Sequence, residues 1–118
     1  MPNLTDQELH NLAMNIVGED LRTKGYEFLG VNSELKKNPQ FVVVKGGKLS
    51  FVIVRAIPYP YNPAEFEAVF FRSIKEHAEK FNARTYYAGV GLANSVDYEL
   101  PVTSDEDYVV NFPGLKEI

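Results

Sequence analysis

Hydrophobic residues recur at helical spacing near the start of the chain and predict an amphipathic helix over residues 5–24. The apolar stripe consists of Leu9, Leu12, Ala13, Ile16, Val17 and Leu21. Thr5 and Glu8 have the spacing of a capping box, in which each side chain bonds the backbone amide of the other residue. Gly25 suits the left-handed conformation that commonly follows the last turn. We therefore expect the helix to end just before Gly25.

The clearest β pattern lies in the middle of the chain. Residues 26–31, 40–45 and 48–57 are rich in β-branched and aromatic residues and predict three strands. Gly46-Gly47 joins the second and third of these runs and suits a tight hairpin turn. The third run is apolar on both faces, which is typical of a central strand covered from both sides.

A proline-rich connector over residues 58–63 separates the hairpin from a second predicted helix. Asn62 is expected to cap this helix, with Pro63 at its first position and Asn82 at its end. A strand over residues 84–92 follows, and a strand–helix–strand crossover favours parallel pairing. The predicted apolar stripe of the helix is Phe66, Val69, Phe70, Ile74, Ala78 and Phe81.

The end of the chain predicts an acidic loop over residues 93–107 and a short edge strand over residues 108–112. Together the elements predict a single α/β domain, of mixed α+β pairing, over residues 1–118. Its central mixed sheet should have about four or five strands and two main helices, in the order αβββαβ(β). Gly89-Val90-Gly91 lacks the context of a phosphate-binding loop and indicates close packing near a strand end.

The amino-acid composition excludes several kinds of catalytic and metal-binding site. The chain contains no cysteine, which excludes disulfides, iron–sulfur clusters, thiolate zinc sites and cysteine nucleophiles. Its two histidines, His10 and His77, are far apart in sequence and argue against a transition-metal site. We expect no metal and no other cofactor. The net charge of −4 lacks the basic surplus of proteins that grip phosphate backbones.

Location is predicted from the same composition. No segment approaches the roughly 20 consecutive apolar residues that a membrane-spanning helix needs. The first residues lack the basic start and apolar core of a signal peptide. We therefore expect a cytoplasmic protein without a membrane partner.

Two stretches have a familiar texture: Pro39-Gln40-Phe41-Val42-Val43 and, after a short turn, Phe51-Val52-Ile53-Val54-Arg55. They resemble the Pro-Asp-Phe-Val-Val and Phe-Val-Glu-Val-Lys patterns of the PD-(D/E)xK nuclease superfamily. The element order between Thr5 and Ala93 resembles the restriction-endonuclease-like core of that superfamily, which runs helix, strand, two-stranded hairpin, helix, strand. The resemblance implies a restriction-endonuclease-like fold.

The resemblance also implies a catalytic site in which two carboxylates hold a divalent metal and a lysine assists the attacking water. The corresponding positions here are Gln40, Ile53 and Arg55. Isoleucine cannot ligate a metal, and arginine cannot give up its proton at working pH. The hypothesis that follows is an uncharacterised small domain that has lost the metal chemistry. It would work by contact, as a catalytically inactive nuclease-like binding or scaffold protein.

Two alternatives stay open. Glu19 and Asp20 on the first helix and Glu34 before the hairpin are candidate substitute carboxylates for a divergent metal-dependent nuclease, although each also suits solvated surface charge. The second alternative is a non-cleaving nucleic-acid binder. Its candidate contacts are Lys36, Lys37, Lys45 and Lys48.

Arg55 and the connector tyrosines have both structural and functional interpretations. A charge among apolar neighbours needs a partner or an outlet to water, so we favour an ion pair or an exposed tip for Arg55 over an anion-binding site. Tyr59 and Tyr61 are candidate interface residues for an unknown protein partner or a homodimer, because tyrosine rings bury area while their hydroxyls still bond. The alternative is that these rings cover the core under a rigid loop.

Overall fold

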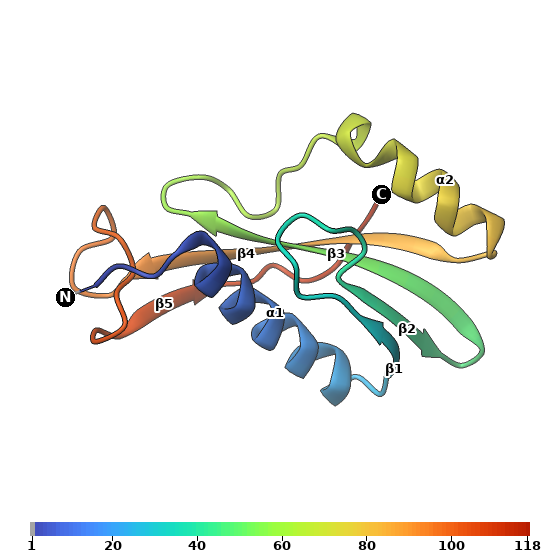
Figure 1. Ribbon diagram of the computed structural model, residues 1–118, viewed down its shortest axis with the longest axis horizontal. Coiled ribbons are helices and arrows are strands. Elements are labelled where there is room, and N and C mark those ends of the chain that lie inside the picture. Colours follow the sequence, from blue (N-terminus) through green and yellow to red (C-terminus); the bar gives the residue numbers. More distant parts are fainter. Residues whose placement is uncertain (1) are drawn as a thin grey trace.

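In the computed structural model, local sequence signals set the bounds of most elements (Figure 1). The structure describes residues 2–118, so Met1 of the predicted domain lies outside the described residues. The elements are α1 (Asp6–Thr23), β1 (Glu27–Val31), β2 (Phe41–Lys45), β3 (Lys48–Pro58), the 3-10 helix η1 (Ala68–Phe71), α2 (Arg72–Lys80), β4 (Arg84–Asn94), β5 (Tyr108–Asn111) and β6 (Lys116–Glu117).

The strands form one mixed sheet in the order β1-β2-β3-β4-β5, and β6 also pairs with β4. Neighbouring strands are antiparallel except β3 and β4, which run parallel from the pair Ser50–Arg84 to the pair Pro58–Leu92. The predicted mixed α+β fold, the hairpin and the parallel crossover are therefore confirmed. β6 was not predicted, because two paired residues leave no periodic pattern in the sequence.

The first helix begins where its capping box predicts. The Thr5 hydroxyl accepts a hydrogen bond from the Glu8 amide at 3.1 Å, and the Glu8 carboxylate accepts one from the Thr5 amide at 2.9 Å. The buried face of α1 packs on one side of the sheet and forms the main core with β2, β3 and β4. This core includes Ala13, Met14, Val17, Leu21, Val43, Val52, Val54, Ala88 and Val90.

The predicted start of the second helix is wrong. Asn62 accepts a bond from the Ala64 amide at 2.9 Å, as a cap would, but the first helical residue is Ala68. Residues 63–67 instead cross over β4, where Pro63 is buried against Gly89 and Phe66 stacks on Tyr87 with 4.8 Å between ring centroids. These contacts override the local helix signal.

The predicted apolar stripe of this helix is also largely wrong. Of its members only Ala78 is buried, in a small cluster with Phe51 and Ala83, whereas Phe70 is 75% exposed. Phe51 and Val52 belong to the two different clusters, so α1 and α2 cover opposite faces of β3 (Figure 1). Among residues 2–118, no helix combines the length and the apolar character that crossing a membrane requires.

Candidate functional site

Gln40, the first of the nuclease-like positions, is fully buried and completes the end of a β ladder. The pairing of β2 with β3 ends at Phe41 and Val52, so the Val54 amide has no strand partner on that side. The Gln40 side-chain oxygen accepts from the Val54 amide at 2.7 Å, and its nitrogen donates to the Lys37 carbonyl at 3.0 Å. The Gln40 amide thus serves the backbone of its own sheet.

The other two positions differ from each other in environment. Ile53 is fully buried opposite Tyr87 of β4. The Arg55 guanidinium turns around the open edge of β3, donating to the Val54 carbonyl at 2.8 Å and to the Asn38 side chain at 2.9 Å. It also lies 3.4 Å from the Gln40 oxygen. The structure therefore brings Gln40 and Arg55 together.

Of the candidate substitute carboxylates, Glu19 and Glu34 are exposed and Asp20 is half-buried. Glu19 pairs with Arg22, and Asp20 lies 3.0 Å from Lys24 on the same helix. Glu34 is exposed in the loop that follows β1. Residues 2–118 hold no group of three or more acidic or histidine side chains placed to bind a metal ion. The relocated nuclease site stays a prediction.

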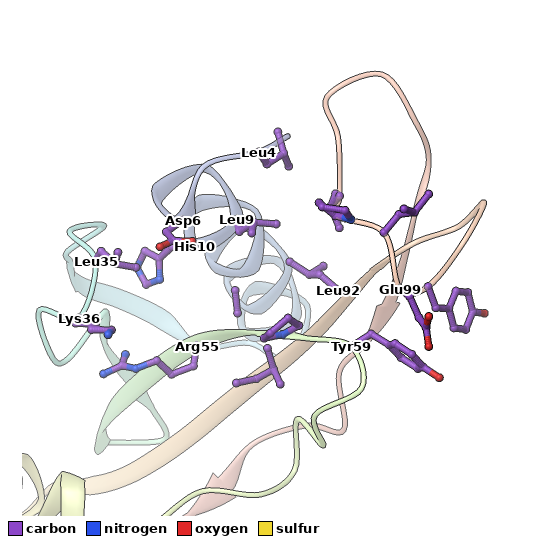
Figure 2. Close-up of a pocket in the computed structure, with 17 residues that line it drawn as sticks. Leu4, Asp6, Leu9, His10, Leu35, Lys36, Arg55, Tyr59, Leu92 and Glu99 are labelled. Atoms are coloured by element: carbon purple, nitrogen blue, oxygen red, sulfur yellow. The ribbon is translucent and has the colours of Figure 1, made fainter. Parts of the chain in front are cut away.

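A pocket of about 470 Å³ opens at the end of the sheet where the parallel strands β3 and β4 finish (Figure 2). Its walls come from the start of α1, the loop after β1, the end of β3, Leu92 near the end of β4, and the loop over residues 98–102. The apolar part of the lining includes Leu4, Leu9, Ala56, Leu92, Leu100 and Val102. The carboxyl ends of parallel strands are a common place for ligands in α/β sheets.

The polar groups of the pocket lie mainly at its two ends. Figure 2 shows Lys36, Arg55 and His10 at one end, with Asp6 beside His10, and Glu99 and Tyr59 at the other. Tyr59 is one of the two tyrosines predicted for an interface. Its ring meets that of Tyr98 edge to face, with centroids 5.4 Å apart. Tyr61 is exposed and does not line the pocket.

His10 is the most unusual residue of the pocket. It is only 1% exposed, and its Nε2 atom has no hydrogen-bond partner within residues 2–118. Burial lowers the pKa of His10, and the nearby Arg55 guanidinium lowers it further. The imidazole is therefore neutral at pH 7.

Arg55 places a half-buried positive charge in the wall of the pocket. Burial lowers the pKa of Arg55, with Tyr87 opposing this shift, but an arginine stays charged at working pH. Its bonds go to the neutral amide oxygens of Asn38, Gln40 and Val54. In the part of the chain that the structure describes, no carboxylate forms an ion pair with Arg55. Of the two structural interpretations of Arg55, the ion pair is therefore wrong, and amide oxygens hold the half-buried guanidinium at the edge of β3 instead.

Comparison with known protein families shows which family the chain belongs to. Residues 7–118 match the model of a family described as a domain of unknown function, DUF8840. The chain belongs to this family. The match spans every strand, α2, and all of α1 except its first residue. No curated protein matches the sequence. The nuclease resemblance consequently stays a prediction.

Sequence reasoning missed the pocket and His10. Five segments, separated along the chain, supply the lining, and no periodic pattern signals that they meet. Three pocket residues were singled out from the sequence, but for other roles: Arg55 as a degenerate nuclease position, Lys36 as a nucleic-acid contact and Tyr59 as an interface residue. The available signal for His10 was its helical spacing to Ala13, Val17 and Leu21, three, seven and eleven residues further on, which places it on the buried face of α1.

The lowered pKa of His10 predicts a pH-dependent stability. The unfolded chain, with an ordinary histidine pKa of about 6.5, binds the proton more tightly than the folded chain does. The stabilisation is therefore present above that pH and is lost as pH falls through the folded pKa. Urea unfolding at about pH 7.5 and about pH 5 should show a larger loss for the wild type than for His10→Leu. Equal losses in the two proteins would contradict this assignment.

Proposed function

We propose that this domain is a non-catalytic binding protein that takes a small molecule in the pocket between α1 and the ends of β3 and β4. The observation that carries the proposal is the pocket itself, which has a volume of about 470 Å³ and an apolar middle, with charged groups at its ends. Ligand sites commonly have volumes of about 300–1,000 Å³ and combine an apolar lining with a few convergent polar groups.

The non-catalytic part of the proposal rests on the three nuclease-like positions. The Gln40 side-chain amide is hydrogen-bonded to backbone groups, and Ile53 is fully buried in the sheet. Arg55 is held by amide oxygens at the edge of the pocket. These features support a nuclease-like domain that has turned from metal chemistry to binding.

The proposal predicts saturable binding of apolar small molecules at the pocket. Amide chemical shifts would be followed while neutral octanol, anionic octanoate and cationic octylamine are titrated separately into the protein. At least one probe should shift amides near Leu9, Ala56 and Val102. Ala56→Leu, which adds bulk inside the pocket, should weaken that binding. Ala68→Leu adds the same group on the exposed η1 and should leave it unchanged.

Three results would contradict the proposal. The first is the absence of shifts with every probe, and the second is binding that Ala56→Leu leaves intact. The third is cleavage of plasmid DNA with magnesium or manganese that disappears in Glu34→Ala, which would favour the relocated nuclease instead.

A further inference from the structure

We propose that the ligand of this pocket carries a carboxylate, which binds between Arg55 and His10 while its apolar body lies along the leucine-lined wall. The inference rests on the proposed function, because it names the class of molecule that the same pocket takes.

The first argument is the unmet charge of Arg55. A guanidinium has five N–H donors in a planar fork, and the bonds to Val54, Gln40 and Asn38 use three of them. All three bonds end on neutral oxygens, and within residues 2–118 no carboxylate forms an ion pair with this partly buried guanidinium. Removing a charge from water without such a partner is costly. A planar carboxylate matches the remaining donors of the fork and supplies the missing charge.

The second argument is the unpaired nitrogen of His10. Buried polar atoms in folded proteins almost always have a hydrogen-bond partner, and the Nε2 atom of His10 has none within residues 2–118. His10 lines the same end of the pocket as Arg55, close enough for the guanidinium to lower the pKa of the imidazole (Figure 2). A carboxylate oxygen at this end can accept a hydrogen bond from the imidazole while the guanidinium binds the other oxygen.

The third argument is the charge balance at each end. Around His10, Arg55 and Lys36 are positive and Asp6 is negative, which leaves one net positive charge. One charge suits a carboxylate better than a phosphate monoester, whose charge at pH 7 is about −1.5 to −2. Glu99 lies at the opposite end of the pocket and repels an anion there (Figure 2). The two ends therefore impose one direction on the ligand.

The apolar middle determines the rest of the molecule. Leu9 and Leu92 lie between the Arg55 end and the Glu99 end (Figure 2), and Val102 also lines the pocket. An aliphatic chain or an aryl group removes this lining from water, with a gain of about 25 cal/mol for each Å² of apolar surface buried. The ligand class is thus a small carboxylic acid with an apolar body.

Calorimetric titration with four probes tests the inference: octanoate, octanol, octylamine and octyl phosphate. Octanoate should bind at least about tenfold more tightly than octanol, because hydrogen bonds to charged groups contribute that much. Arg55→Gln should weaken octanoate binding about tenfold or more and leave octanol binding unchanged. Lys36→Gln changes an exposed loop residue that does not threaten folding and should weaken octanoate binding by about two- to fivefold. Lys48→Gln removes the same charge at the distant hairpin turn and should have no effect.

The outcomes separate this inference from the proposed function. One outcome is that octanol or octylamine binds as tightly as octanoate and that Arg55→Gln and Lys36→Gln have no effect. This outcome would overturn the inference that the ligand carries a carboxylate, but it would leave the proposed binding pocket standing. Tighter binding of octyl phosphate than of octanoate would overturn the choice of carboxylate. Failure of all four probes to bind would overturn the proposed function as well.

Discussion

Adding a single methyl group at position 89 is expected to destabilise the protein by about 3 kcal/mol or more. In Gly89→Ala, the new Cβ would lie 2.0 Å from the Pro63 carbonyl oxygen and 2.9 Å from the Tyr87 ring. The oxygen belongs to the backbone of the connector, so it cannot move aside as a flexible side chain would. The connector must lift from β4 and expose Pro63 and Phe66. Urea unfolding followed by circular dichroism measures the loss.

Gly30→Ala is the matched control for this prediction. In β1 a new Cβ would lie 3.7 Å from Val42, at ordinary van der Waals distance. The same substitution there should change the free energy of unfolding by less than about 1 kcal/mol. Similar stabilities for the two variants would show that the connector does not press on β4 as described.

The second large effect is expected at Gln40. Gln40→Leu removes the oxygen that accepts from the Val54 amide and leaves that amide buried without a partner. It also removes one anchor of Arg55. An unsatisfied buried donor costs about 1–3 kcal/mol, and the further lost bonds place the expected loss near the upper end of this range. Urea unfolding measures the loss, and hydrogen exchange should show a faster-exchanging Val54 amide in the variant.

Gln7→Leu is the control for position 40. The Gln7 side chain also donates two hydrogen bonds, to Asn11 and to the Ser33 carbonyl, but it is exposed on α1. Water replaces those bonds, so the expected change is within about 0.5 kcal/mol. If both glutamine variants lose the same stability, the role assigned to Gln40 is wrong.

Local signals predicted those parts of the fold that local contacts determine. The capping box of α1, the Gly46-Gly47 turn and the apolar run of β3 each act within a few residues, and each appears where predicted. The close packing expected around Gly89 is confirmed as well. The second helix was predicted too early, because Asn62 and Pro63 form a valid helix start whose outcome is decided by distant contacts with β4.

The site was predictable only in part for the same reason. The substitutions at Gln40, Ile53 and Arg55 are visible in the sequence, and the structure joins two of these residues by a hydrogen bond. The hydrogen-bond partners of these residues depend on where the pairing of β2 with β3 ends, and no pattern along the sequence specifies that point. Arg55 was expected either to pair with a carboxylate of the chain or to reach water as an exposed tip. It finds amide oxygens instead, and this difference motivates the carboxylate ligand.

The irregular edge strand β1 has a consequence for how separate copies of the protein meet. β1 is an outer strand of the sheet, and the unpaired backbone groups of a regular outer strand form a template for another chain; its side chains Leu29 and Val31 are more than half exposed. The register with β2 shifts between Phe28 and Gly30, so Leu29 is an extra residue that bends the strand. A bent rim offers no straight row of amides and carbonyls, and it opposes edge-to-edge fibre growth at high concentration.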